Sequence, residues 1–367
     1  MTNSRLDRLY QRMNAASLDV LALNPGPSLY YLTGLNFHLM ERPTTLLISL
    51  TAEPVLILPE LEILKINSAR VSLTPVPFGD NPLEWDLAFQ QAADSLKLNE
   101  KRIGVEPTRM RYLELSYLQK AAPTAAFVSG EVVFSQLRIQ KDADEIAAMR
   151  EAAKIAQAAL TDTLPMVKPG VTERELAAEL SINLLRSGSD SEFPFPPIVA
   201  SGPNSANPHA IPSDRKLRTG DLILFDWGAA YQGYFSDITR TFAVGEISPE
   251  LREIYHLVKE ANTAGRSAGK PGLRAGDVDH AARGIIQHAD YGPFFTHRTG
   301  HGLGLESHEG PYMFAENDLV LQEGMVYTVE PGIYLPGKGG VRIEDDMVVT
   351  ANGSESLTDF PRGLTIL

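Results

Sequence analysis

Two aspartates in the middle of the chain could hold a cation. Asp226 follows the apolar run Leu222–Phe225, and Asp237 lies beyond the turn Tyr231–Gly233. If the flanking strands pair, both carboxylates meet on one face, where like charges destabilise a sheet. A buried carboxylate without a partner must be protonated or bind a cation. Alternatively, one aspartate caps the turn and the other pairs with Arg240, so this pair alone leaves metal binding open.

A similar arrangement recurs later in the chain. The stretch Leu217–Gly228 resembles Leu321–Gly332, and their alignment places Asp226 opposite Glu330. Continuing through the following hairpin gives four acids at matching positions: Asp226, Asp237, Glu330 and Glu344. Two similar halves, each with a helix and a strand pair, predict one sheet folded about a pseudo-two-fold axis. Four acids facing that axis indicate a bound cation.

His301 lies in the glycine-rich segment Thr299–Gly304, where glycines let the backbone approach closely and give the imidazole room to reach a site. Alone, such a segment could equally be an anion-binding loop. With the four acids it completes a set of oxygen donors plus one imidazole, which suits Mn²⁺, Co²⁺ or Zn²⁺. These side chains are too many for one catalytic ion, and they suit a pair of ions about 3.5–4 Å apart.

Three further histidines, His209, His297 and His308, lie around these segments. Any one of them alone is more commonly a surface or packed residue than a catalytic one, but their grouping favours a role in the site. The remaining histidines are interpreted as structural: His38, His256, His280 and His288.

The elements that position these residues belong to two domains, as the length of 367 residues suggests. Residues 1–134 are predicted to form an α/β domain, and residues 135–367 an α+β domain with the internal repeat. In the second domain a long helix is expected from Asp142, and Thr172 with Glu175 predicts a capping box. In the first domain we expect strands at 20–23, 45–49 and 54–58, and helices near 84–97 and 109–120.

Composition excludes several other classes of function. The net charge of −13 argues against nucleic acid or an anionic membrane as a partner. The absence of cysteine removes disulfides, thiolate metal sites and cysteine nucleophiles. It also fits a reducing compartment, and the polar first residues contain no signal-peptide core. A cytoplasmic enzyme is therefore expected.

Together these motifs resemble those of the pita-bread metallopeptidases, and within them the Xaa-Pro aminopeptidases (aminopeptidase P) and Xaa-Pro dipeptidases (prolidases). The resemblance extends over essentially the whole chain, with a creatinase-like domain at 1–134 and a pita-bread catalytic domain at 135–367. It rests on five segments: Phe225–Gly228, Ser236–Phe242, Thr299–Gly304, Val329–Tyr334 and Val341–Asp346.

The resemblance implies two divalent ions, most commonly Mn²⁺, and a homodimer or homotetramer. Asp226 and Asp237 would bind one ion, His301 and Glu330 the other, and Asp237 and Glu344 would bridge them. A metal-bridging hydroxide, formed with help from Glu330, would attack a peptide that has proline at its second position. Four more residues have implied roles around this reaction. His209 and His308 would stabilise the intermediate and assist proton transfer, His297 would support them, and Arg342 would orient the carboxylates.

The choice within the family depends on recognition of the substrate carboxylate. Prolidases often carry an arginine for it after the second histidine, whereas Glu309–Val329 contains neither lysine nor arginine. We therefore predict a Xaa-Pro aminopeptidase that also acts on peptides longer than two residues. A dipeptidase remains the alternative, because the first domain or a neighbouring subunit could supply the basic group.

Three other readings are less favoured. Methionine aminopeptidases usually lack the N-terminal domain, and creatinases lack the metal ligands. A peptide-binding module that does not cut its ligand would be expected to have lost ligands, and none is missing here.

Overall fold

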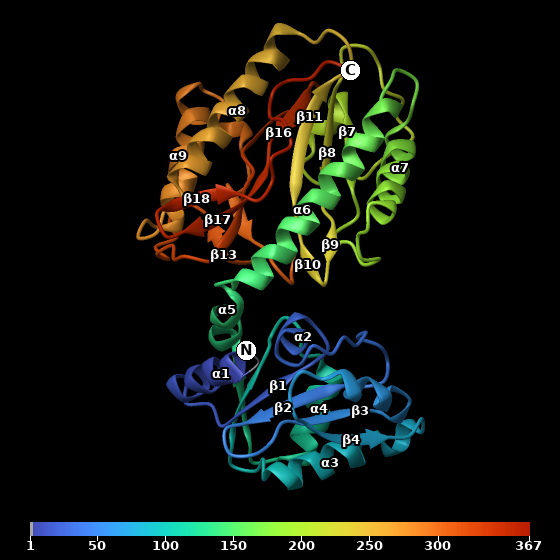
Figure 1. The fold of residues 1–367 in the computed structure, drawn as a ribbon, viewed down its shortest axis with the longest axis vertical. Coiled ribbons are helices and arrows are strands. Elements are labelled where there is room, and N and C mark those ends of the chain that lie inside the picture. The colour runs from blue at the N-terminus through green and yellow to red at the C-terminus, as the bar shows by residue number, and fades with distance from the viewer. Residues whose placement is uncertain (1–2) are drawn as a thin grey trace. The chain divides into compact units, whose positions relative to one another are not determined.

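The computed structural model describes residues 3–367 (Figure 1) and divides after Arg138 into two compact units. The N-terminal unit is a layered α/β structure, and the C-terminal unit, Ile139–Leu367, is built from helix pairs and antiparallel strands. Within the described residues, no helix combines the length and the apolar character needed to cross a membrane.

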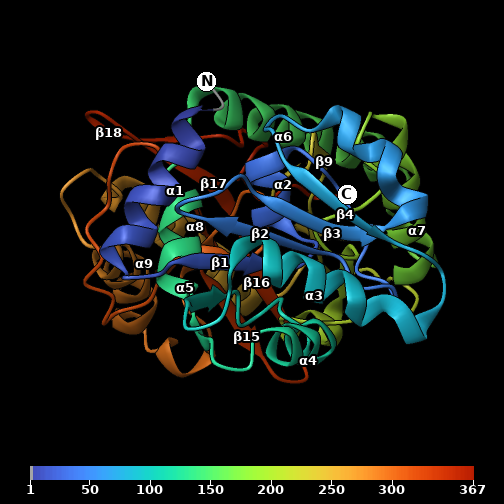
Figure 2. The ribbon, with the colours of Figure 1, turned by 90° about the horizontal axis from the view of Figure 1, so that it is seen from below.

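The N-terminal unit contains a six-stranded sheet in the order β4-β3-β2-β1-β5-β6, part of which is visible in Figure 2. Strand β1 pairs antiparallel with β2 and parallel with β5. The central strands β1 to β3 are buried along their whole length, because their continuous apolar sequences suit a sheet covered on both faces. The strands span Val20–Leu23, Thr45–Ser49, Val55–Pro59, Thr74–Phe78, Arg102–Val105 and Ala126–Ser129.

Helices α3 and α4 pack on one face of this sheet, where their apolar side chains join those of the strands in one core. Along α3, Trp85, Phe89 and Ala92 recur at the helical spacing that buries one face. The predicted strands and helices of this domain are confirmed within a few residues. The helices are α1 Asn3–Ala15, α2 Pro27–Thr33, α3 Trp85–Leu96, α4 Tyr112–Ala121 and α5 Glu131–Arg138, with 3₁₀ segments η1 Glu60–Ser68 and η2 Pro82–Glu84.

The first half of the C-terminal unit begins with the predicted long helix, whose N-cap is Asp142. The capping box of Thr172 and Glu175 at the start of α7 is also confirmed. Helices α6 and α7 pack together, and Trp227 donates from Nε1 to the carbonyl of Ala156 (2.8 Å), tying β8 to α6. The elements are α6 Ala143–Thr163, η3 Leu164–Met166, α7 Glu173–Arg186, β7 Ile198–Ser201, η4 Gly202–Ala206, β8 Leu222–Trp227, β9 Ala230–Tyr231, β10 Tyr234–Phe235 and β11 Ile238–Ala243.

The second half repeats this plan. Helices α8 and α9 pack together, and α8 contacts β14. The elements are α8 Pro249–Ala268, α9 Ala275–His288, η5 Gly292–Phe294, β12 Gly300–Gly302, β13 Glu309–Met313, β14 Val326–Val329, β15 Gly332–Leu335, β16 Gly339–Arg342, β17 Asp345–Thr350 and β18 Gly353–Ser356.

The repeat predicted from the sequence is present, but its strands form more than one sheet. In each half an antiparallel pair, β8/β11 or β14/β17, is interrupted by a two-stranded hairpin, β9/β10 or β15/β16. The first pair belongs to a three-stranded sheet and the second to a five-stranded sheet. The halves meet where the Glu344 amide donates to the carbonyl of Thr239 (3.1 Å). This hydrogen bond brings the acids of both halves to one place.

Candidate metal centre

The four acids lie where each strand pair opens into its hairpin. In the first half, Asp226 of β8 is paired with Thr239 of β11, and Asp237 directly precedes β11. In the second half, Glu330 directly follows β14, whose last residue is paired with Asp345, and Glu344 directly precedes β17. The similar placement follows from the repeated strand-hairpin-strand plan.

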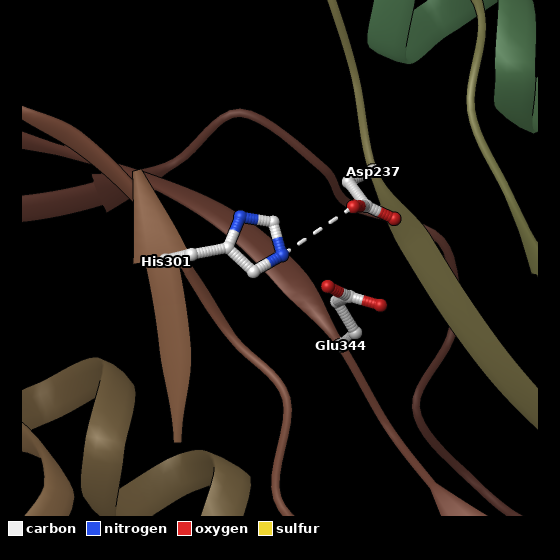
Figure 3. A group of neighbouring side chains, drawn as sticks. All are labelled: Asp237, His301 and Glu344. Atoms are coloured by element: carbon white, nitrogen blue, oxygen red, sulfur yellow. Dashed lines mark ion pairs between the residues drawn. The ribbon is translucent and has the colours of Figure 1, made fainter. Parts of the chain in front are cut away.

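Three of the predicted ligands form a tight, buried group. Asp237, His301 and Glu344 each offer one ligand atom, and these atoms lie within 4.8 Å of one another. Figure 3 shows the imidazole of His301 turned toward the two carboxylates, with its Nε2 3.7 Å from Oδ2 of Asp237. The carboxylates come from different halves of the repeat, and His301 comes from β12.

The other two predicted ligands flank this group. Oε1 of Glu330 lies 3.4 Å from Nε2 of His301, and the Glu330 amide donates to the carbonyl of Thr299 (2.8 Å). Asp226 is connected through Arg342, whose Nη2 forms an ion pair with Oδ2 of Asp226. The structure thus brings all five predicted ligands into one neighbourhood.

The glycines around His301 allow the close backbone approach that the sequence predicts. A Cβ at Gly300 would lie 1.9 Å from the carbonyl oxygen of Thr328, and one at Gly302 would lie 2.2 Å from that of Gly310. Glycine is therefore required because β12 is wedged between β13 and β14. The close packing fixes the backbone from which His301 projects.

Burial makes the acids difficult to ionise. It raises the pKa of Asp237 and of Glu344 well above the ordinary range, and neighbouring carboxylates add to both shifts. Burial also raises the pKa of Glu330 to about 7 and lowers the pKa of His301 well below its usual value. A bound cation would reverse the shifts of the carboxylates by favouring their charged form, and it would reinforce the neutral form of the imidazole that burial already favours.

Two carboxylate oxygens support the same interpretation. Within residues 3–367, Oδ1 of Asp226 and Oδ1 of Asp237 are buried and accept no hydrogen bond. Buried polar atoms are ordinarily satisfied, so these oxygens have coordination capacity to spare. With the other oxygen donors and one imidazole, they fit a hard or borderline divalent cation.

A second group of side chains holds the acids in position. Arg342 donates from Nε to Oγ1 of Thr239 (3.0 Å) and from Nη1 to the Tyr334 hydroxyl (2.9 Å). Thr239 in turn donates from Oγ1 to Glu344 (2.6 Å). Nε2 of His297 contacts the Tyr334 hydroxyl at 2.8 Å, and burial with the charge of Arg342 lowers the pKa of His297 to about 3. His297 is therefore a neutral hydrogen-bonding partner.

His308 and His209 are exposed, unlike the ligands. The His308 ring meets the His301 ring edge to face, with centroids 3.9 Å apart. His209 occupies a loop whose Pro208 carbonyl accepts a bond from Nη1 of Arg342 (3.4 Å). The His308 ring thus contacts the predicted ligand His301, and the loop of His209 is hydrogen-bonded to Arg342. Solvent can reach both histidines.

Several residues of this neighbourhood were not predicted. Thr239 donates a hydrogen bond to Glu344, and the Tyr334 hydroxyl accepts one from Arg342. Oδ2 of Asp346 accepts from the Asp237 amide (3.0 Å). Arg298 stacks its guanidinium on the Tyr312 ring, 4.4 Å from the centroid. Proximity to the ligand motifs was a usable signal, since each lies within four residues of a predicted ligand. Their partners could not be deduced from spacing.

Comparisons with known proteins agree with this architecture. Residues 147–351 match the model of metallopeptidase family M24, and residues 5–140 match that of the creatinase/prolidase N-terminal domain. Metal dependence is part of the family description. The buried group around Asp237, His301 and Glu344 is consistent with it.

Solved structures cover nearly the entire chain. A dipeptidase from Pyrococcus horikoshii OT3 is 39% identical, with a TM-score of 0.93 and coverage of 99% of this chain and 100% of the other. A Xaa-Pro dipeptidase from Bacillus anthracis is 36% identical, with a TM-score of 0.91 and complete coverage of both chains. An X-Pro aminopeptidase from Thermotoga maritima MSB8 is 32% identical, with a TM-score of 0.86, covering 98% and 99%.

Proposed function

The chain belongs to metallopeptidase family M24, and we propose that it is a Xaa-Pro dipeptidase of the prolidase type that uses two divalent ions. The buried group of acids and one imidazole carries the metal-dependent part of this proposal. The Xaa-Pro specificity rests on similarity to the Bacillus anthracis enzyme along both whole chains. This proposal replaces our first preference, an aminopeptidase for longer peptides.

The ions would be held by five side chains: Asp226, Asp237, His301, Glu330 and Glu344. Mn²⁺ is the ion we propose first, with Co²⁺ or Zn²⁺ as substitutes, because the donors are mostly oxygens. Divalent ions at such a site supply Lewis acidity toward the scissile carbonyl and lower the pKa of a water nucleophile.

The protein would supply the proton transfers and the orientation of the substrate. Glu330 lies beside His301 in the proposed ligand group, and its carboxylate is suited to take the proton of the attacking water. His209 and His308 are exposed beside the ligands and could donate hydrogen bonds to the developing oxyanion and protonate the leaving nitrogen. Arg342, Tyr334 and His297 would keep the carboxylates oriented through their hydrogen bonds.

Arg298 supports the choice of a dipeptidase. No basic residue lies between Glu309 and Val329, but the guanidinium of Arg298 stacks on Tyr312 inside that segment. Burial and the charge of Arg298 both lower the pKa of His308, so this charge acts on the exposed side of the site. A positive group there is suited to the free carboxylate of a dipeptide.

An aminopeptidase for longer peptides is the second candidate. Similarity to the Thermotoga maritima X-Pro aminopeptidase favours it, since the TM-score is 0.86 over nearly all of both chains. A binding module without activity is a third reading. Intact ligand positions weigh against that reading.

The test compares an Xaa-Pro dipeptide with an Xaa-Pro-Xaa tripeptide in Mn²⁺, with and without a chelator. We expect the dipeptide to be cut faster and the chelator to abolish cleavage. Faster cleavage of the tripeptide would establish the aminopeptidase instead, and no cleavage of either would favour the binding module.

Two further properties complete the proposal. We propose a cytoplasmic location, consistent with a chain that contains no cysteine. We also propose a homodimer or homotetramer, as the family resemblance implies. Light scattering that gives the mass of a monomer would refute the second statement.

A further inference from the structure

The proposed function gives His209 a role but does not explain how the loop that carries it is held in place. This loop runs from Ser201, the last residue of β7, to Ser213. Three prolines, at 203, 208 and 212, restrict its backbone. His209 is exposed, and its amide donates to Oδ1 of Asn207 (3.1 Å). The place of its imidazole therefore depends on how the loop backbone is held.

One buried carboxylate holds both ends of this loop. Glu173, the first residue of α7, is completely buried. Its Oε1 accepts from the amide (2.6 Å) and hydroxyl (2.7 Å) of Ser201. Its Oε2 accepts from the amide (3.1 Å) and hydroxyl (2.6 Å) of Ser213. Nδ2 of Asn204 donates to both oxygens at 3.1 Å.

All six of these contacts require an acceptor at Glu173. A carboxylate provides acceptor sites on both oxygens and no donor when it is ionised. Glutamine would keep the volume but place an NH₂ group against one set of donors. The loss would be local, because the helix cap is made by Thr172 and Glu175.

The middle of the loop is attached to the candidate metal centre. Oγ of Ser205 accepts from the amide of Gly340 (2.8 Å), and the Pro208 carbonyl accepts from Arg342 (3.4 Å). Arg342 also forms the ion pair with Asp226. Glu173 thus holds the loop at Ser213 and Arg342 holds it at Pro208, so His209 lies in the chain between two fixed points.

We infer that Glu173 is a positioning residue for His209, closing the loop into a rigid mount that presents this imidazole to the substrate. The inference rests on the proposed function, in which His209 contacts the leaving group. Displacement of a catalytic group by about 1 Å can reduce a rate about 100-fold. A carboxylate distant from the reaction can therefore control turnover through geometry alone.

A double-mutant cycle tests this inference with Mn²⁺-loaded full-length protein and an Xaa-Pro dipeptide. His209→Asn should lower kcat about 100-fold, and Glu173→Gln should lower it about 10- to 100-fold with little change in KM. In the His209→Asn background, Glu173→Gln should cost less than about twofold, because the residue it positions is gone. Equal losses in both backgrounds, or no effect of either single change, would overturn the inference.

Glu175→Gln is the matched control. It makes the same substitution in the same first helical turn, but Glu175 is exposed and its carboxylate accepts hydrogen bonds from the amide and hydroxyl of Thr172. We expect kcat to stay within about twofold of wild type, since exposed charges contribute little. A loss equal to that of Glu173→Gln would mean that helix stability, and not the loop, explains the effect.

Hydrogen exchange gives a readout that does not need activity. Glu173→Gln should increase amide exchange in residues 202–212 at least about tenfold, and Glu175→Gln should not. Unchanged amide exchange in residues 202–212 of the Glu173→Gln variant would refute the inference that Glu173 holds this loop in place. This outcome would count even if the wild type proved inactive. Inactive wild type with increased exchange would instead refute only the proposed function.

Discussion

Glu344 and Asp345 are adjacent in the chain and equally inaccessible, yet their surroundings are opposite. Glu344 faces other carboxylates, and burial together with Glu330 and Asp226 raises its pKa. Burial would raise the pKa of Asp345 too, but Arg240 and Arg362 overcome this and lower it to about 2. Asp345 also accepts from Asn262 and Thr358. The protein thus neutralises one acid with its own cations and leaves its neighbour among other acids, as the proposed metal site requires.

This difference separates a structural ion cluster from a functional one. The Asp345 cluster (Asp345, Arg240, Arg362, Asn262 and Thr358) has charges of both signs. The acids around Glu344 mainly face one another, although Arg342 pairs with Asp226. Within the described chain, Oδ1 of Asp226 and Oδ1 of Asp237 are buried without hydrogen bonds. Buried charge therefore identifies a site only when its partners are considered.

The largest expected effect is on turnover. Glu330→Gln should lower kcat about 1,000-fold, because it removes the proposed proton acceptor. The free energy of unfolding of the metal-free variant should not fall, since a repulsive acid has been removed. Steady-state kinetics and urea unfolding measure the two quantities. Turnover at the wild-type rate would exclude the role proposed for Glu330.

In the Asp345 cluster, substitution is expected to lower stability. Asp345→Asn should lower the free energy of unfolding by about 3–5 kcal/mol, because it leaves the completely buried Arg240 without its ion-pair partner. Urea unfolding in the presence of chelator measures this loss. If the loss is under about 1 kcal/mol, the two clusters do not differ as described.

The two clusters should also respond to pH with opposite signs. The pKa of Glu330 is raised from 4.5 to about 7, so the folded protein keeps a proton that the unfolded chain has lost. Metal-free protein should lose up to about 3 kcal/mol of stability from this group as pH rises from about 4.5 to 7. Asp345 stabilises above its unfolded pKa of 3.8, and this contribution is lost as pH falls toward 2.

Unfolding measured between pH 5 and 7.5 in chelator tests the first part. Glu330→Gln should reduce the downward slope of stability with pH, and Glu175→Gln should leave it unchanged. An identical slope in the wild type and Glu330→Gln would contradict the assignment.

Added metal should stabilise the folded chain by a smaller amount. At a Mn²⁺ concentration about 100 times the Kd, the gain is about 2.7 kcal/mol. Glu344→Gln should lose most of this gain because it removes a central ligand. Thermal unfolding with Mn²⁺ and with chelator provides the comparison, and an equal shift in this variant would argue that the ion binds elsewhere.

The smallest effect is expected at Arg298, an arginine outside both clusters. Arg298→Gln should raise KM for an Xaa-Pro dipeptide about 10-fold, which corresponds to one charge-assisted contact. The dipeptide amide, which lacks the carboxylate, should be affected less than about twofold. Equal effects on acid and amide would show that Arg298 does not recognise the substrate carboxylate.

Sequence patterns predicted the elements and the ligand neighbourhood well, because both depend on local signals. Capping at Asp142 and Thr172 and the repeated strand-hairpin-strand plan are local, and the structure has them. The division of the repeat into separate sheets was missed, since strand pairing between distant segments leaves no periodic signal. The different surroundings of Glu344 and Asp345 could not be predicted from the sequence either. Arg240, which donates a hydrogen bond to Asp345, is 105 residues away in the chain.

The substrate preference shows the same limit. The prediction of an aminopeptidase considered only the segment after His308, where no basic residue occurs. Arg298 precedes that segment in the chain and reaches Tyr312 through the pairing of β12 with β13. Inspection of that segment alone therefore did not consider Arg298, which strand pairing places against Tyr312.

The hydrogen bonds between Thr239 and Glu344 have a consequence for the order of events during synthesis. These residues are 105 positions apart, so the first half leaves the ribosome long before its partner strand exists. Until then the nascent chain carries Asp226 and Asp237 without the other ligands. Domains generally fold as units as they emerge, so a site built from all five proposed ligands would form only after both halves have been translated.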